Sequence, residues 1–145
     1  MRRWAGGCQC GAVRYVLTRE SIAVYACHCR ECQKQSASAF GLSLPFARAE
    51  LELTGALAAY RRPTDSGSFT TGSFCPKCGV RLFHVSDRDP SRGTLKAGTL
   101  DDTSGLEPRF HIWTSRKQPW VQLAGDIPQF DEQSADLDLT RKLMR

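Results

Sequence analysis

The chain has 145 residues, the length of one ordinary domain, and we expect a single domain spanning residues 1–145 whose core needs no disulfide staples. It carries 20 basic and 15 acidic side chains, but five of the basic ones lie outside residues 4–140, while every acidic one lies inside. The body of the chain is therefore neutral, and its lack of a basic stripe argues against nucleic acid as a partner.

The first residues contain no apolar stretch typical of a secretory signal, and no later apolar run is long enough to span a bilayer. We therefore expect a cytoplasmic protein with no membrane partner. Because the cytoplasm is reducing, cysteines there are more often metal ligands or catalytic thiols than disulfides.

Most of the elements that the sequence predicts are short strands separated by turn-forming residues. These strands are expected at residues 12–17, 40–44, 51–54, 80–85 and 94–100. The second of them is expected to stop at Pro45. Helices are expected only over residues 30–38 and 134–143, and surface loops over residues 63–68 and 86–93. This pattern predicts a mainly β fold of antiparallel sheets with little helix.

Seven cysteines occur in clusters along the chain, which favours metal binding over a disulfide framework. Cys75 and Cys78 have the C-x-x-C spacing of a zinc knuckle, in which Gly79 is expected to accept a positive φ. Cys8 and Cys10 at i and i+2 would project to one side of an extended backbone. Together the four thiols predict a closed structural zinc site. A redox pair is the alternative for Cys75 and Cys78, although no βαβ pattern surrounds them.

The hexapeptide CHCREC, residues 27–32, holds the remaining three cysteines. Cys27 and Cys29 are expected to point to one face and His28 to the other, with Cys32 turning back as the second half of a C-x-x-C. Three thiolates leave one position on a zinc ion for water or substrate, which is the arrangement of a catalytic site.

Two further sets of residues have alternative interpretations. His84 or His111 would close the three-cysteine site if either supplied a fourth ligand, whereas a lone histidine is more often a structural side chain. Arg30, Gln33 and Lys34 follow the cysteines and are suited to a substrate carboxylate. The alternative is a solvated helix face.

Five motifs follow one another along the chain, and Lys117 and Trp120 come after them: GCQCGAVRY (7–15), CHCRECQK (27–34), FCPKCG (74–79), GTLDD (98–102) and PRFHI (108–112). In this order they resemble the glutathione-dependent formaldehyde-activating enzyme family, which is shared with centromere protein V. The resemblance covers most of the chain, and the triple CHCxxC with flanking CxCG and CPxCG is its specific part.

The resemblance implies a mainly β, Mss4-like fold of antiparallel sheets with zinc knuckles and two zinc ions per chain. It assigns one ion, structural, to Cys8, Cys10, Cys75 and Cys78, and the other, catalytic, to Cys27, Cys29 and Cys32. It further implies a carbon–sulfur lyase that joins a thiol such as glutathione to formaldehyde or another small aldehyde. The alternative is a non-catalytic Mss4-like zinc module that binds a protein.

The sequence departs from the family pattern at two positions. Gly72 stands where many relatives have a basic residue, and Ala37 stands where many have glycine. Both positions lie near the expected metal sites and bear on the identity of the substrate. For the aromatic side chains of the last motifs, including Trp113 and Trp120, we expect core packing.

Overall fold

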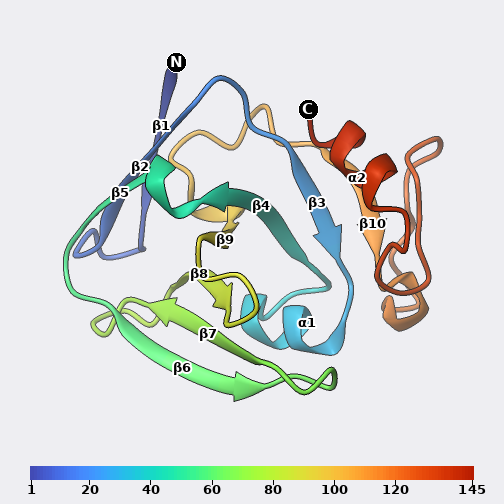
Figure 1. Ribbon diagram of the computed structural model, residues 1–145, viewed down its shortest axis with the longest axis horizontal. Coiled ribbons are helices and arrows are strands. Elements are labelled where there is room, and N and C mark those ends of the chain that lie inside the picture. The colour runs from blue at the N-terminus through green and yellow to red at the C-terminus, as the bar shows by residue number, and fades with distance from the viewer. The chain divides into compact units, whose positions relative to one another are not determined.

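The computed structural model describes all 145 residues, residues 1–145 (Figure 1). Its contacts divide the chain into two compact units, each built from segments that lie far apart in the sequence. Unit 1 comprises residues 1–20 and 45–105, and unit 2 comprises residues 21–44 and 106–145. The expectation of one domain stays a prediction. None of the helices has the length and apolar character that crossing a bilayer requires.

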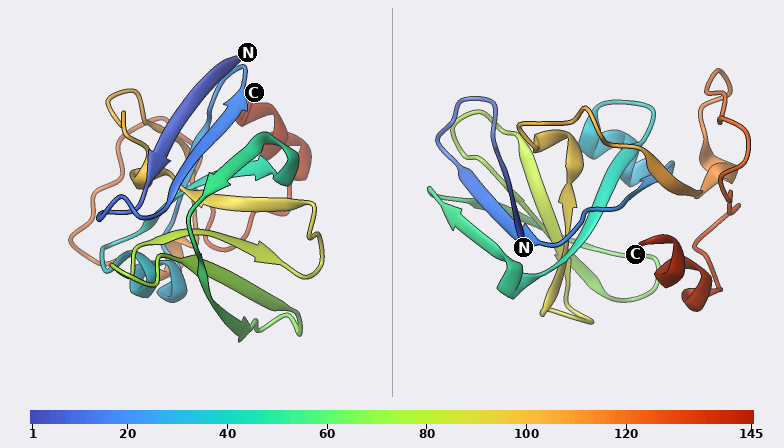
Figure 2. Two further views of the ribbon diagram at one scale, coloured as in Figure 1. Left: turned by 90° about the vertical axis from the view of Figure 1, so that its left-hand side faces the viewer. Right: turned by 90° about the horizontal axis from the view of Figure 1, so that it is seen from above.

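Unit 1 contains a three-stranded antiparallel sheet in the order β1-β2-β5. Its strands are β1 (Arg2–Gly7), β2 (Arg14–Arg19) and β5 (Leu51–Thr54). β1 and β2 lie side by side (Figure 2), with Gly7 opposite Arg14. Tyr15 and Leu17 alternate inward along β2 and are buried, as the strand period requires. The strands predicted at residues 12–17 and 51–54 are thereby confirmed, the first with a shift of two residues.

Four more antiparallel strands of unit 1 follow in the order β9-β8-β7-β6 (Figure 1). They are β6 (Ala58–Pro63), β7 (Phe69–Phe74), β8 (Arg81–Ser86) and β9 (Arg92–Lys96). The predicted loop at residues 63–68 is the turn between β6 and β7. β8 confirms the strand predicted at residues 80–85, and the loop predicted next is largely the turn that joins β8 to β9.

The strand predicted at residues 94–100 is correct only in its first half. Its second half forms the short 3-10 helix η2 (Ala97–Thr99). The Thr99 hydroxyl donates a hydrogen bond of 2.7 Å to the carbonyl of Lys96 and lies 2.8 Å from the hydroxyl of Tyr15. These side-chain hydrogen bonds give the polar groups of the turn partners within the turn, and so compete with continued strand pairing. A second 3-10 helix, η1 (Arg48–Glu50), precedes β5.

Gly72 of β7 lies under a side chain from the neighbouring strand. A Cβ atom built on Gly72 would overlap the guanidinium of Arg81 at the start of β8. The absence of a side chain on Gly72 therefore leaves the space that the Arg81 guanidinium occupies.

In unit 2, strands follow in the order β10-β3-β4. They are β3 (Val24–Cys27), β4 (Gly41–Ala47), whose last residues belong to unit 1, and β10 (Pro108–Ile112). β3 pairs with β4 in antiparallel fashion, but β10 runs parallel to β3, with Ile112 opposite Cys27. This parallel pair is an exception to the antiparallel architecture that the short strands predicted.

The strand expected to stop at Pro45 continues through it. β4 pairs with β3 only at residues 41–43, so Pro45 needs no N–H group for that ladder. The carbonyl of Pro45 accepts a hydrogen bond of 2.7 Å from the guanidinium of Arg19. The predicted stop was wrong: a proline interrupts a strand only where its missing donor is required, and the ladder with β3 does not require it at residue 45.

The helices of unit 2 are α1 (Arg30–Ser36), the 3-10 helix η3 (Thr114–Arg116) and α2 (Leu137–Leu143). Both predicted helices are confirmed in shortened form. α2 begins at an Asp136 cap, whose carboxylate accepts from the N–H of Leu139 at 2.8 Å. α1 ends because Ala37 adopts the left-handed conformation with φ 50°.

Candidate metal centres

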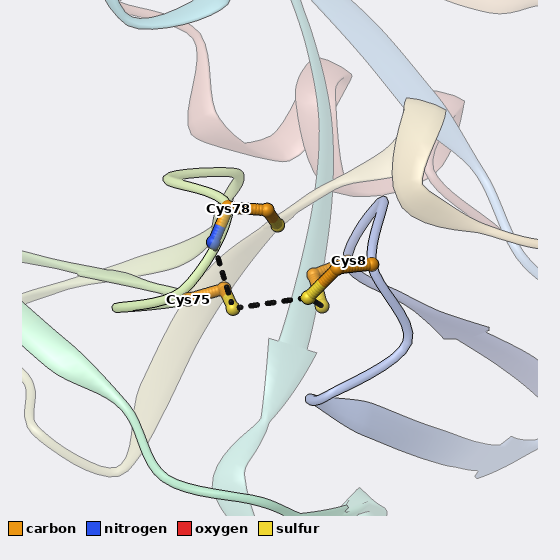
Figure 3. A group of neighbouring side chains, drawn as sticks. Cys8, Cys75 and Cys78 are labelled. Atoms are coloured by element: carbon orange, nitrogen blue, oxygen red, sulfur yellow. Dashed lines mark hydrogen bonds between the residues drawn. The ribbon is translucent and has the colours of Figure 1, made fainter.

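The first cysteine cluster lies in unit 1 and joins two turns. Cys8 and Cys10 lie in the turn after β1, and Cys75 and Cys78 lie in the turn after β7. Their four sulfur atoms all lie within 4.8 Å of one another. Figure 3 shows the side chains of Cys8, Cys75 and Cys78 turned toward a common centre. The structure therefore brings together the four thiols that their spacing grouped.

The sulfur spacing of this cluster fits a zinc ion. The Sγ atoms of Cys8 and Cys10 lie 3.6 Å apart, and those of Cys10 and Cys75 lie 3.8 Å apart. A zinc–sulfur bond of about 2.3 Å places two ligands of a tetrahedron about 3.8 Å from each other. The four-cysteine cluster could therefore hold a metal ion such as zinc, with a full set of ligands from the protein.

Both turns close in the same way, through a glycine. The N–H of Gly11 donates to the carbonyl of Cys8 at 3.2 Å, and the N–H of Gly79 donates to that of Cys75 at 2.8 Å. Gly11 has φ 79° and Gly79 has φ 81°, so the positive φ predicted for Gly79 is confirmed. The extended backbone expected around Cys8 is wrong, because the strand ends at Gly7 and the Gly11 bond closes a turn.

Backbone N–H groups support the thiolate form in this cluster. The N–H of Val13 donates to Cys8 Sγ at 3.2 Å, and the N–H of Cys78 donates to Cys75 Sγ at 3.5 Å. A hydrogen bond from the N–H of Val80 is the main cause that lowers the pKa of Cys78 to about 6. Donors of this kind stabilise the deprotonated sulfur that a metal ligand must be.

The second cluster lies in unit 2 at the junction of β3 and α1. Cys27 is the last residue of β3, Cys29 caps α1, and Cys32 lies in the first turn of that helix. The three sulfur atoms lie within 4.8 Å of one another. Cys27 and Cys32 are buried and Cys29 is partly exposed. This cluster could also hold a metal ion, with one sulfur atom facing the solvent side.

The three thiols differ in acidity because they share hydrogen bonds. Bonds from the thiols of Cys27 and Cys32 lower the pKa of the Cys29 thiol to about 2. The same contacts with Cys29 and Cys32, together with burial, raise the pKa of Cys27. The N–H of Cys32 adds a bond of 3.4 Å to Cys29 Sγ. Cys29 is therefore the sulfur atom that carries negative charge first.

The histidines that were considered as a fourth ligand have other partners. The cluster contains three sulfur atoms and no histidine nitrogen. His111 Nδ1 lies 2.8 Å from Nε2 of His28, and His84 Nδ1 lies 2.9 Å from the Lys96 ammonium. As expected, His28 lies outside the cluster although cysteines flank it on both sides.

His28 is completely buried and neutral. Burial, followed by the nearby His111 and Lys117, lowers the pKa of His28 to about 4. Its ring packs against Phe40, with the ring centroids 5.2 Å apart. Its Nδ1 atom is buried without a hydrogen-bond partner, so the ring acts as a packing element with one polar atom unsatisfied.

Gln33 fixes the backbone between the cysteines. Its side chain is 4% exposed, and its amide nitrogen donates to the carbonyl of His28 at 2.7 Å and to that of Arg116 at 2.9 Å. Its amide oxygen accepts from the guanidinium of Arg30 at 2.7 Å and from the amide of Gln118 at 3.3 Å. One side chain therefore ties the CHC segment, α1 and the segment after β10 together.

The two buried cysteines of the second cluster belong to the apolar core of unit 2. They pack with Phe110 and Ile112 of β10, and the partly buried Leu143 and Met144 at the end of α2 pack against the same group. Apolar contacts on this side keep solvent from two of the three sulfur atoms.

Trp113 and Trp120 behave differently from each other. Trp113 is partly buried against the cysteine-containing core, in line with the expected core packing, and adopts φ 56°. Trp120 is 72% exposed, so core packing was wrong for this residue. Its indole N–H donates to the side-chain oxygen of Gln118 at 2.7 Å, which holds the ring at the surface.

Two residues near the second cluster were not indicated by the sequence. A Cβ atom on Gly41 would lie 3.2 Å from Cβ of Cys32, so glycine leaves room for that cysteine. Gln118 bonds to Gln33 across 85 positions of sequence. For Gly41, the only local signal in the sequence is the glycine itself, directly after Phe40. For Gln118 there is no local signal, because a long-range pairing with Gln33 brings it to the cluster.

The fold and the two cysteine clusters define a mainly β protein with two candidate metal centres. The model of the family described as "Glutathione-dependent formaldehyde-activating enzyme" matches residues 3–116. The chain belongs to this family, which has the Mss4-like fold. The resemblance drawn from the cysteine motifs is therefore confirmed.

A solved structure supports the fold. The chain is similar to a crystal structure of a Rhodobacter sphaeroides protein, determined as a Northeast Structural Genomics target, with a TM-score of 0.54 and 22% sequence identity. The match covers 86% of this chain and 98% of that protein. At this identity the similarity concerns the fold alone.

Proposed function

We propose that the protein is a zinc-dependent carbon–sulfur lyase-type enzyme that adds a thiol such as glutathione to formaldehyde or another small aldehyde. The observation that carries this proposal is the second cluster, in which three thiols converge and only Cys29 is partly exposed. Membership of the family, which is named for glutathione and formaldehyde, supports the substrate class.

In this proposal the two clusters have different roles. Cys8, Cys10, Cys75 and Cys78 hold a structural zinc ion, and Cys27, Cys29 and Cys32 hold a catalytic one. When bound to three thiolates, zinc supplies a cation with a free position that favours the thiolate form of an incoming thiol.

The reaction itself needs no oxidant or reductant. The thiol sulfur forms a bond to the carbonyl carbon, the carbon–oxygen double bond becomes a single bond, and the thiol proton ends on the oxygen. The product is a hydroxymethyl thioether in the case of formaldehyde. The chain's task is to hold both reactants together and to shield them from water.

Residues around the second cluster suit these tasks. The apolar side chains of β10 and α2 exclude water from Cys27 and Cys32. Gln33 holds the carbonyl between Cys27 and Cys29 in place. His28 is fully buried and has a pKa of about 4, so we assign it to packing and not to proton transfer at neutral pH.

The test is the rate of S-hydroxymethylglutathione formation, followed by exchange NMR at neutral pH, for the wild type and Cys29→Ser. We expect the wild type to exceed the uncatalysed rate and the variant to match it. Circular dichroism should show that Cys29→Ser keeps its fold, because the four-cysteine cluster is intact. Full activity in Cys29→Ser would contradict the proposal. No rate enhancement by the zinc-loaded wild type would favour the alternative, a non-catalytic zinc module that binds a protein.

A further inference from the structure

A cavity of about 350 Å³ opens on unit 1, and its volume lies within the range typical of small-molecule sites. All of its lining residues fall within residues 48–90, and none of them is a cysteine. The neighbouring strands β7 and β8 form its floor (Figure 1), and η1 and the turn after β8 contribute to its walls. The cavity is therefore a feature of unit 1 alone and contains no candidate metal ligand.

The floor of the cavity is an apolar surface that carries two hydroxyl groups. Thr71 of β7 lies opposite Val85 of β8. Two positions along, Ser73 lies opposite Phe83, so all four side chains project from one face of the sheet. Phe83 is 4% exposed and packs edge-on against Phe46, with the ring centroids 5.8 Å apart, which fixes this part of the floor. The two hydroxyls can each donate a hydrogen bond to a ligand.

The cation of the cavity is Arg48, which comes from η1. Its backbone N–H donates to the carbonyl of Ser91 at 2.8 Å, which holds η1 against the turn between β8 and β9. Its guanidinium carbon lies 5.6 Å from the centroid of the Phe83 ring, a cation–π distance that places the charge over the floor. This contact uses a face of the guanidinium and leaves its in-plane N–H donors for a ligand.

The carboxylates closest to Arg48 in the sequence and at the cavity have other partners. Glu50, in the same 3-10 helix, lies 4.0 Å from the guanidinium of Arg19. Asp87, which lines the cavity, accepts a hydrogen bond of 3.1 Å from the N–H of Phe69. Arg48 forms no ion pair with any acidic side chain of the chain. Its guanidinium therefore lacks an anion that a ligand could supply.

We propose that this cavity binds a small organic acid, whose apolar body lies on the floor and whose carboxylate is held by Arg48. A guanidinium suits a carboxylate because its donors form a planar fork, and the hydroxyls of Thr71 and Ser73 add further donors. Leu57 lines the same cavity and is 36% exposed, so the apolar part of the ligand covers a side chain that is otherwise open to water. The inference is independent of the proposed function, because the ligand is neither a thiol nor an aldehyde.

The test is binding of phenylacetate to the zinc-loaded protein, followed by the shifts of backbone amide signals in NMR. A ligand of this size should bind with a Kd of about 1 mM or lower, and the largest shifts should fall in β7, β8 and η1. Acetate lacks the apolar body and phenylethanol lacks the carboxylate, so each should bind at least about tenfold more weakly.

Variants identify the group that holds the carboxylate. Arg48→Gln should weaken phenylacetate binding about tenfold, as loss of a charge-assisted hydrogen bond predicts. Arg48→Lys keeps the charge and should recover part of that loss. The control Arg109→Gln, which removes an exposed arginine of unit 2, should leave the affinity unchanged. Leu57→Ala should weaken phenylacetate severalfold without affecting acetate, and it tests the cavity even if Arg48→Gln proves unstable in urea denaturation.

The outcomes are separate from those of the proposed function. Equal affinity of phenylacetate for the wild type and Arg48→Gln would overturn the inference, and so would shifts confined to unit 2. No shift at about 10 mM phenylacetate would overturn it as well. Cys29→Ser should bind phenylacetate as the wild type does, so loss of thiol addition in that variant leaves this site testable on its own.

Discussion

Replacing Gln33 by methionine tests how the second cysteine cluster is held. Methionine has a similar length and volume but lacks the amide, so all four hydrogen bonds of Gln33 are lost. The carbonyls of His28 and Arg116 each lose a donor beside a buried side chain. At about 1 kcal/mol for each of these two bonds, and more where a carbonyl stays unsatisfied, we expect a loss of about 2–3 kcal/mol of unfolding free energy.

The assay is urea denaturation of the reduced, zinc-loaded protein, with the rate of zinc transfer to a chromophoric chelator as a second readout. Gln35→Met is the matched control, because Gln35 lies on the same helix and its amide oxygen is buried without a partner. We expect Gln35→Met to be neutral or stabilising. Equal stability of the two variants, or a loss below about 1 kcal/mol in Gln33→Met, would refute the reasoning.

Three further predictions concern backbone conformation and pH. Gly79→Ala should lower the unfolding free energy by about 1–2 kcal/mol, because Gly79 has φ 81°. Gly98→Ala is the control and should cost less, since a Cβ atom added there has no neighbour within 4 Å. Equal losses of unfolding free energy in urea denaturation would contradict this prediction. Ala37→Gly removes the strain of the left-handed φ of 50° but increases the conformational entropy of the unfolded chain, so the unfolding free energy should rise by only about 0.5 kcal/mol. A lower denaturation midpoint in Ala37→Gly would contradict this. Burial raises the pKa of Tyr15 to about 12, above the value of about 10 in unfolded chains. The protonated hydroxyl therefore contributes to the free energy of unfolding in full below pH 10, and this contribution is lost as the pH rises toward 12. At pH 11 the loss is about 1.4 kcal/mol, and Tyr15→Phe should remove this part of the pH dependence; an unchanged slope of unfolding free energy against pH would show that Tyr15 is not its source.

The metal-ligand sets could be predicted because cysteine spacing is a local property. Cys75 and Cys78 are brought together by a turn that Gly79 permits, and Cys27 and Cys29 by two steps of backbone. Which cysteine pairs combine into one cluster depends on long-range contacts. The pair at Cys8 and Cys10 could still be grouped with the pair at Cys75 and Cys78, because two pairs supply the four ligands of a tetrahedral zinc site.

Other features depend on partners that no local pattern identifies. β6 was not predicted because most of its residues are exposed and its alternation is weak, so the pairing with β7 decides its conformation. Neither β3 nor β10 was predicted as a strand, and their parallel pairing depends on the path of the chain between them. Trp120 was expected in the core because it is apolar, but its bond to Gln118 holds the ring at the surface.

The central claim is that Cys27, Cys29 and Cys32 form an open zinc site that accepts a thiol. Native mass spectrometry of freshly reduced protein tests it most directly, by counting zinc ions per chain before and after glutathione is added. The account predicts two zinc ions, and a glutathione adduct that is present in the wild type and absent in Cys29→Ser. One zinc ion per chain and no adduct, even after zinc is resupplied, would contradict it.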